Sequence, residues 1–152
     1  MSEFKITLLR PQDCSAWSRM LTQNSVQYME YFRPFDFDEG TLRNILSDAK
    51  ADRYWGIWWG SDLAGFFMLR GFDAGFRIPA YGVCISENFA NRGLLKVSLE
   101  CALAWCRLAG IERMMLKVHP DNKVARATYE KFGFSASGTD PKNGHLIYHR
   151  TV

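Results

Sequence analysis

Residues 122–134 read NKVARATYEKFGF, and this stretch carries the most information about the fold. Asn122 and Tyr129 are seven positions apart, so in a helix they share one face, about two turns from each other. Gly133, followed by the apolar Phe134, predicts a helix end with glycine in the left-handed conformation. An amide and a phenol on one helix face can hold a ligand. A tyrosine that merely packs against the core is the structural alternative.

Residues 87–96 read ENFANRGLLK and lead from a predicted strand end into a predicted helix. A helix N-terminus exposes unpaired backbone N–H groups and the positive end of the helix dipole, so it can bind a phosphate. Gly93 allows a close approach of the backbone, and Arg92 and Lys96 add positive charge. The alternative is a glycine that serves only the geometry of the turn.

The elements around these two stretches predict a crossover between parallel strands. Strands are predicted at about 76–86 and 114–119, with a helix over about 93–109 between them. A helix that connects two strands in this way places them parallel, with a right-handed turn. The helix is predicted from one apolar stripe, which consists of Leu95, Leu99, Ala102, Leu103 and Cys106.

The rest of the chain has the patterns of helices and antiparallel hairpins. A first helix opens at Pro11, a second follows Asp38, and Asp121 is the predicted N-cap of the helix described above. Residues 24–37 are irregular and aromatic. Further strands are predicted at 5–9, 54–59, 63–69, 134–138 and 145–151. The predicted class is therefore α+β, a mixed sheet with helices on its faces.

Composition and charge are those of one folded domain, expected to span residues 1–152. The chain has 152 residues, of which 47% are hydrophobic and 23% charged, which is enough for a sizeable core. A net charge of +3 is too mild to indicate a nucleic-acid-binding protein. Residues 1–91 carry nine basic and eleven acidic residues, whereas 92–152 carry ten and five. The C-terminal part therefore attracts anions.

Several classes of protein are excluded by simple patterns. No apolar run approaches the length of a membrane span, and the charged start of the chain lacks the apolar region of a signal peptide. The four cysteines form no C-x-x-C pair and have no histidine at metal-ligand spacing. We therefore expect a cytoplasmic protein with reduced thiols, no metal, and neither a membrane nor a nucleic-acid partner.

Together the two stretches resemble the GNAT superfamily of acyl-CoA-dependent N-acetyltransferases. The family's helix pattern N-x-x-A-x-x-x-Y-x-x-x-G-F is matched fully from Asn122 to Phe134. Its phosphate-loop pattern Q/R-x-x-G-x-G/A is matched only at Gly93, since Ala90 and Leu95 differ. The order of elements fits the family over essentially the whole chain. The resemblance implies a mostly antiparallel mixed sheet of about six to seven strands, with a splayed parallel pair and helices on both faces.

The resemblance also implies acetyl-CoA as the cofactor and assigns residues to it. Tyr129 would protonate the leaving thiolate, a role that needs good positioning because a phenol is a weaker acid than a thiol. Backbone groups of Val83, Cys84 and Ile85 would face the pantetheine arm. The remaining expected cofactor contacts are Asn91, Arg92, Gly93, Leu94, Leu95, Lys96, Asn122 and Arg126.

The general base and the acceptor site are less sharply indicated. His119, at the end of its strand, is the candidate base because the pKa of histidine suits it. Glu87 and a water held by Tyr81 are the alternatives. Aromatic side chains suit an apolar or sugar-like acceptor, although packing is an alternative for most of them. The expected acceptor-binding residues are Tyr28, Tyr31, Phe32, Trp58, Arg70 and Tyr81.

The leading hypothesis is transfer of acetyl from acetyl-CoA to a primary amine of a small molecule, for example an amino sugar, by direct attack. Two features support this hypothesis: the expected acceptor region is aromatic, and the sequence indicates no acidic groove that would hold a basic peptide. A protein N-terminal or lysine acetyltransferase is the alternative within the class. A catalytically silent acyl-CoA-binding module is the alternative outside it, motivated by Ala90 and Leu95. For the assembly of the protein, the hypothesis includes a homodimer.

Overall fold

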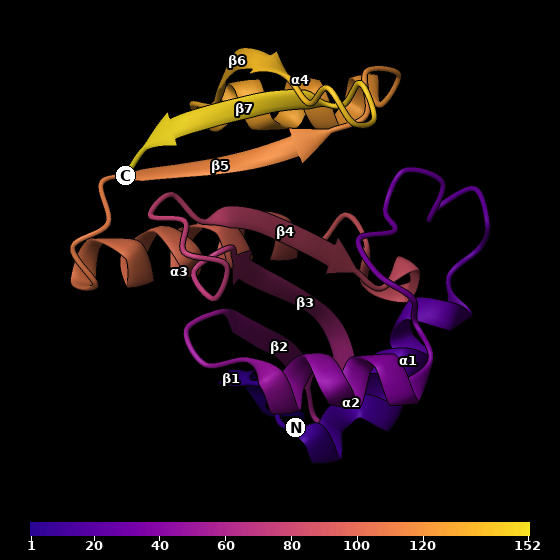
Figure 1. The fold of residues 1–152 in the computed structure, drawn as a ribbon. Coiled ribbons are helices and arrows are strands. Elements are labelled where there is room, and N and C mark those ends of the chain that lie inside the picture. Colours follow the sequence, from indigo (N-terminus) through magenta and orange to yellow (C-terminus); the bar gives the residue numbers. More distant parts are fainter.

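A seven-stranded sheet organises the computed structural model, which describes residues 1–152 (Figure 1). The strand order is β1-β2-β3-β4-β5-β7-β6, and only β4 and β5 are parallel neighbours. This confirms the predicted mixed, mostly antiparallel sheet. The strands are β1 (Phe4–Leu8), β2 (Arg53–Trp59), β3 (Asp62–Arg70), β4 (Ala80–Ile85), β5 (Arg113–Val118), β6 (Ser135–Thr139) and β7 (Leu146–Thr151).

Helices cover both faces of the sheet and define two cores. On one face α1 and α2 enclose a cluster that includes Trp17, Leu42 and Phe66. On the other face α3 and α4 lie over a cluster that includes Leu103 and Phe67. The α-helices are α1 (Cys14–Gln23), α2 (Glu39–Asp48), α3 (Leu94–Leu108) and α4 (Lys123–Lys131), with short 3-10 turns at Pro11–Asp13 and Glu87–Phe89. None of these helices has the length and apolar character required to cross a membrane.

The parallel strands β4 and β5 meet at one point and then diverge (Figure 1). Their single paired position is Ala80 with Met115, where the Met115 N–H donates to the Pro79 carbonyl at 3.0 Å. Beyond it β4 stays paired with β3, and β5 stays paired with β7. The Ser86 N–H donates to Ala64 in β3. Because backbone groups alternate along a strand, those of Val83 and Ile85 face the gap.

The C-terminal end of α4 has the predicted geometry. Gly133 has φ +89°, and its N–H donates to the Glu130 carbonyl at 3.1 Å. The Phe134 N–H donates to the Tyr129 carbonyl at 3.0 Å, which completes the two-bond motif that ends helices at glycine. The buried Phe134 then anchors this end of α4 to the sheet.

Two predicted boundaries are wrong. The strand expected from residue 76 begins only at Ala80, because the Phe76 N–H is engaged in a turn with Gly71 and Pro79 has no N–H for a ladder. The N-cap of α4 is Asn122 rather than Asp121, since the Asn122 carbonyl oxygen Oδ1 accepts from the Ala125 N–H at 3.2 Å. Both expected elements exist, with ends shifted.

Candidate active site

A cavity of about 400 Å³ occupies the place where β4 and β5 diverge. We call it the splay cavity. It brings together the N-terminal loop between α1 and α2, the ends of both parallel strands and one face of α4. Its lining residues are Gln27, Tyr28, Met29, Tyr31, Phe32, Val83, Cys84, Ile85, Leu95, Lys117, Val118, His119, Asn122, Ala125 and Tyr129.

Tyr129 lies in the wall of the splay cavity with its ring packed and its hydroxyl unpaired. Its ring meets those of Tyr81 and Phe134 edge-on, at 6.5 and 5.8 Å between centroids. No group of the chain accepts from or donates to the hydroxyl, which is not sealed from the cavity. Burial raises the pKa of Tyr129 above its ordinary value of 10.0. The Tyr129 ring is therefore fixed by packing, and its neutral hydroxyl is a potential proton donor in the wall of the splay cavity.

Asn122 lines the same cavity and also caps the helix that carries Tyr129. Its Oδ1 is used by the Ala125 N–H, which leaves the amide Nδ2 as a donor without a partner in the chain. The capping bond fixes the side chain, so the donor is held at the start of α4. The structure thus brings the predicted Asn–Tyr pair to one cavity, as the shared helix face indicated.

The loop before α3 presents a row of free backbone donors. Asn91 and Gly93 have positive φ values of 61° and 84°, and Asn91 is the one non-glycine residue of the chain with this feature. The first α3 bond to this loop runs from the Val97 N–H to the Gly93 carbonyl, 3.2 Å away. The N–H groups of residues 91–96 therefore find no acceptor in the chain, and successive unpaired N–H groups form an anion site.

The two departures from the phosphate-loop pattern leave this row of donors intact. The side chain of Leu95 lines the splay cavity, so it forms part of the wall between the loop and the β4 edge. Ala90 is partly buried and contributes no donor side chain. A Cβ at Gly93 would meet no atom within 4 Å, so this glycine is needed for its positive φ. The donors are backbone groups, and they fit a pyrophosphate regardless of these side chains.

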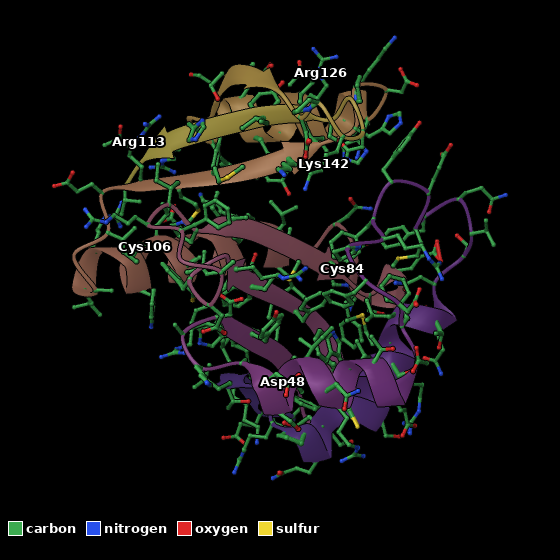
Figure 2. The ribbon with its side chains drawn as sticks, in the orientation of Figure 1. Asp48, Cys84, Cys106, Arg113, Arg126 and Lys142 are labelled. Carbon is green, nitrogen blue, oxygen red and sulfur yellow. The ribbon has the colours of Figure 1, made fainter.

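The predicted cationic contacts of the loop divide into two groups. Arg92 and Lys96 are exposed beside the free N–H groups, and the Arg92 guanidinium lies 5.7 Å from the Phe89 ring centroid. Arg126 lies on α4, beside β7 (Figure 2). Its guanidinium donates to the Pro120 carbonyl at 3.0 Å and to the Tyr148 hydroxyl at 3.4 Å. Arg126 therefore ties α4 to β7 and does not line the splay cavity.

His119 lines the splay cavity, with one ring nitrogen already engaged. Its Nδ1 accepts from the Asp121 N–H at 3.1 Å, and the Asp121 carboxylate lies 4.0 Å from the same nitrogen. The bond assigns the neutral ring a proton on Nε2. The ring packs on Tyr31 and His145, with centroids 4.8 and 5.4 Å away.

The two other candidate bases have structural partners. The Glu87 carboxylate accepts from the Ser25 N–H at 2.9 Å and from the Ser25 hydroxyl at 3.0 Å, and Glu87 is absent from the cavity lining. The Tyr81 hydroxyl lies 2.7 Å from the Ser98 Oγ. Burial raises the pKa of Tyr81 well above its ordinary value.

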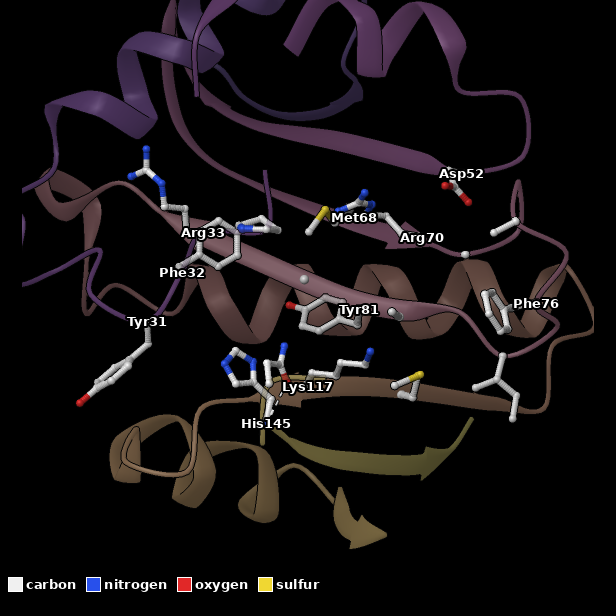
Figure 3. Close-up of a pocket in the computed structure, with 18 residues that line it drawn as sticks. Tyr31, Phe32, Arg33, Asp52, Met68, Arg70, Phe76, Tyr81, Lys117 and His145 are labelled. Carbon is white, nitrogen blue, oxygen red and sulfur yellow. Dashed lines mark hydrogen bonds between the residues drawn. The ribbon is translucent and has the colours of Figure 1, made fainter. Parts of the chain in front are cut away.

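A second cavity of about 660 Å³ adjoins the first on the α1–α2 face of the sheet. We call it the outer cavity. Met68 and Arg70 of β3 line one side of it, while Lys117 and His145 line the other (Figure 3). Tyr31, Phe32 and Lys117 line both cavities, so the cavities adjoin at these residues. The outer cavity is lined by Tyr31, Phe32, Arg33, Pro34, Asp52, Met68, Arg70, Gly71, Ala74, Phe76, Ile78, Ala80, Tyr81, Gly82, Met115, Lys117, Asn143 and His145.

The structure separates two of the predicted acceptor residues from the outer cavity. Trp58 lines neither cavity, because its indole N–H donates to the Thr7 Oγ1 across the β1–β2 pair at 3.1 Å. Tyr28 lines the splay cavity, where its hydroxyl donates to the Ile85 carbonyl at 2.7 Å. Burial, followed by the charges of Cys84 and Glu87, raises the pKa of Tyr28 to about 12. Tyr31, Phe32, Arg70 and Tyr81 do line the outer cavity.

Sequence reasoning did not single out three basic residues of the outer cavity, Arg33, Lys117 and His145. Arg33 belongs to the aromatic segment 24–37 but was not singled out. Lys117 precedes His119 by two positions, and the period of a strand would have placed both on one face. His145 lies beyond any motif of the sequence, although its ring contacts that of His119.

The splayed parallel pair, the unpaired N–H groups before α3 and the phenol of Tyr129 border one cavity. The chain belongs to the acetyltransferase (GNAT) family, whose model matches residues 17–134. It is 33% identical over 78 residues to the L-amino acid N-acetyltransferase of Escherichia coli (strain K12), a match that covers 46% of each chain. The chain thus spans less than half of the length of that relative.

Solved structures share the fold over the full chain. The PaiA N-acetyltransferase from Thermoplasma acidophilum, crystallised with coenzyme A, has a TM-score of 0.81 at 17% identity, and the match covers 99% of each chain. The ribosomal L7/L12 alpha-N-protein acetyltransferase RimL has a TM-score of 0.81 at 15% identity, covering 100% of this chain and 96% of that one. The expected family and fold are therefore confirmed.

Proposed function

We propose that this protein binds acetyl-CoA and transfers the acetyl group to a primary amine of a small molecule by direct attack. The observation that carries the proposal is the unpaired Tyr129 hydroxyl in the splay cavity. On one side of that cavity lies a row of free backbone donors, and on the other lies a second cavity. A proton donor, a candidate phosphate site and a space for an acceptor thus all adjoin the splay cavity.

Backbone groups supply most of the proposed cofactor contacts. The free N–H groups of residues 91–96 would hold the pyrophosphate, with Arg92 and Lys96 adding charge around it. The gap-facing groups of Val83 and the Ile85 N–H would pair with the amides of the pantetheine arm. The backbone groups of Cys84 point to β3, so Cys84 would contribute only its side chain, as part of the wall of the splay cavity. The N–H donor of the Asn122 amide would face the arm near its thioester end.

Tyr129 would protonate the sulfur as it leaves. A bound thioester supplies an activated acyl carbon and a thiolate leaving group. Because burial raises the pKa of Tyr129, the phenol stays protonated until a strong base forms beside it. A thiolate that develops in a dry cavity is such a base. Positioning by the Tyr81 and Phe134 rings keeps the hydroxyl in place for this step.

His119 would take the proton that the attacking amine loses. The lone pair of Nδ1 accepts the Asp121 N–H, so this bond must open before Nδ1 can take the proton of the amine. The new N–H then has the Asp121 carboxylate, 4.0 Å from Nδ1, as its acceptor. Glu87 is not proposed as the base, since both of its oxygens are engaged by Ser25.

The charges of the outer cavity support a small molecule over a basic peptide. The cavity contains three cationic side chains and a single carboxylate, that of Asp52. A lysine-rich or free N-terminal peptide would need acidic groups to hold it. The relatives include enzymes named for an amino acid and for a ribosomal protein, so the acceptor must be decided by measurement.

Two measurements test the proposal. Saturating acetyl-CoA should raise the melting temperature, since ligands that bind only the folded state stabilise it. Thiol release should then be recorded for a panel of small amines, amino sugars, lysine peptides and free N-terminal peptides. Turnover confined to peptides would contradict the proposed acceptor class. Stabilisation by acetyl-CoA without thiol release on any amine would instead favour a silent acyl-CoA-binding module.

A further inference from the structure

The outer cavity carries an excess of positive charge that the proposed chemistry does not use. Three cationic side chains line it, and Asp52 is the one acidic residue in the lining. Lys117 is neutralised by Asp140, whose carboxylate lies 2.7 Å from the ammonium and has a lowered pKa for that reason. Arg33 and Arg70 have no carboxylate within 4.0 Å. Neither guanidinium therefore has an ionic partner, and that of Arg33 lies over the Phe37 ring, 5.1 Å from its centroid, pointing away from the centre of the cavity (Figure 3).

Arg70 is the better placed of the two arginines. It is partly buried, whereas Arg33 is exposed. Its guanidinium lies 5.3 Å from the Phe35 ring centroid and beside the Tyr54 phenol, where its charge opposes the burial that raises the pKa of Tyr54. Arg70 ends β3 opposite Ala80, the position at which β4 and β5 are still paired. The arginine is thus fixed near the closed end of the splay.

The floor of the cavity gives a ligand access to this guanidinium. Met68 and Arg70 lie on the α1–α2 face of β3, and Ala80 and Gly82 lie beside them on β4. Neither of the β4 residues has a long side chain, but the Met68 side chain lies over Gly82, so a ligand at Arg70 reaches toward the splay past this flexible thioether. Apolar side chains of Phe76 and Ile78 complete this end of the cavity.

We propose that the acceptor amine carries a carboxylate, as an amino acid does, and that Arg70 binds this carboxylate. A planar guanidinium pairs with a carboxylate through two parallel hydrogen bonds and is costly to bury without a partner. The cavity volume suits a ligand of this size. This inference rests on the proposed acetyl transfer and narrows its acceptor. The name of the Escherichia coli relative points the same way.

The anion at Arg70 belongs to the acceptor and not to acetyl-CoA. The free N–H groups that suit phosphates lie at the start of α3, whose helix packs against the opposite face of the sheet. The cavity that adjoins that loop shares only Tyr31, Phe32 and Lys117 with the outer cavity. Arg70 lines the outer cavity alone, and so a carboxylate held there leaves an amine free to point toward the splay.

Three matched amines test this inference: phenylalanine, phenylalanine amide and phenethylamine. Glucosamine is added as an amino sugar that has no carboxylate. With the wild-type protein kcat/KM should be about tenfold or more higher for phenylalanine than for the other three, because only it offers a partner to the guanidinium. Arg70→Gln should remove about tenfold or more of that advantage, mainly through KM. It should change phenethylamine turnover little. Arg19→Gln, an exposed arginine on α1, is the matched control and should leave the order of acceptors intact.

Equal or better turnover of phenethylamine or glucosamine by the wild-type protein would overturn the inference, and so would an equal loss on all acceptors in Arg70→Gln. If Arg70→Gln does not fold, the wild-type comparison alone decides. If no amine is turned over, the proposed function fails separately. Thermal stabilisation of the acetyl-CoA-loaded protein by phenylalanine, but not by phenethylamine, then still tests the carboxylate site. No difference between these two ligands would count against it.

Discussion

At the scale of single residues, the hydroxyl of Tyr129 is separable from the packing of its ring. The ring contacts Tyr81 and Phe134, whereas the hydroxyl bonds to nothing in the chain. Tyr129→Phe should therefore fold normally and bind acetyl-CoA with nearly unchanged affinity. Thiol release at saturating substrates should fall about tenfold or more, because a positioned general acid contributes at least that much.

A matched control for Tyr129→Phe is Tyr81→Phe, which deletes the hydroxyl of the neighbouring ring. That hydroxyl bonds to Ser98 in the core, so its loss should lower the melting temperature more than turnover. Unchanged turnover in Tyr129→Phe would mean that water, and not the phenol, protonates the thiolate.

Buried thiols give the protein a defined response to alkaline pH. Burial raises the pKa of Cys84 to about 12 and, with a smaller opposing effect of Arg107, that of Cys106 to about 11, both from 9.0. Their pKa values are higher in the folded state, so the unfolded chain loses these protons first. The stability they contribute is complete below pH 9.0 and is lost as the pH rises toward the folded values.

The melting temperature should therefore begin to fall near pH 9.0, before the tyrosines contribute. Replacing both thiols, in Cys84→Ala/Cys106→Ala, should flatten the fall between about pH 9 and 10. The comparison is of slopes, so a lower overall melting temperature of the variant does not matter. Identical slopes in the two proteins would be the contrary result.

At the scale of elements, the loop between α1 and α2 is fastened to the end of β4. The Glu87 N–H donates to the Asn24 Oδ1 at 2.9 Å, and the Glu87 carboxylate accepts two bonds from Ser25. Tyr28 adds the bond to the Ile85 carbonyl. This loop carries Tyr31 and Phe32, which line both cavities. We therefore propose that Glu87 positions the loop that carries Tyr31 and Phe32.

Glu87→Gln distinguishes this role from that of a general base. A loosened loop should raise KM for the amine about threefold and leave kcat nearly unchanged, whereas loss of a base would cost about a hundredfold in kcat. Glu100→Gln, an exposed position on α3, serves as the control. A large fall of kcat with unchanged KM would return Glu87 to the catalytic machinery.

The phosphate loop depends on backbone conformation, and a glycine pair allows this to be tested. Gly93→Ala must adopt φ near +84°, which costs about 1–2 kcal/mol and distorts the row of N–H donors. The Kd for CoA should rise about tenfold, since charge-assisted bonds to the phosphates are lost. Gly110 also has a positive φ of 72° with open space around it. Gly110→Ala should lose similar stability and keep its affinity for CoA.

An equal effect of the two glycine variants on CoA affinity would show that the loop acts only through overall stability. Calorimetric titration with CoA, beside thermal unfolding of the free proteins, separates these outcomes.

The elements were predictable from sequence to the extent that local chemistry determines them. The glycine-ended helix at Gly133 and the crossover from β4 to β5 followed from spacing alone. The cap of α4 was misplaced because Asp and Asn cap helices equally well. The choice between Asp121 and Asn122 depends on the His119 ring, which takes the Asp121 N–H. A bond from a backbone N–H to a side chain within the folded turn accompanies that boundary.

At the scale of the whole molecule, the cofactor side of the site was more predictable than the acceptor side. Asn122 and Tyr129 come from one helix, so their periodicity brings them together. The outer cavity joins Arg33, Arg70 and His145 from a loop, β3 and the β6–β7 connection. No local pattern reports contacts over such separations. Trp58 shows the opposite error. It was predicted in the acceptor site because it is a large aromatic residue, but its side chain bonds to Thr7 across the β1–β2 pair.

Because Ala80 and Met115 form the single bridge between β4 and β5, the sheet is interrupted along most of the length of these two strands. Amide hydrogen exchange should reveal this directly. The Val83 and Ile85 amides, which face the gap, should exchange far faster in the free protein than those of Gly82 and Cys84, which pair with β3. Added CoA should slow the first two selectively, and a uniform slowing would argue against pairing at this edge. On the proposed function, the pantetheine arm of acetyl-CoA takes the place of a missing strand beside β4, and the sheet is completed only while the cofactor is bound.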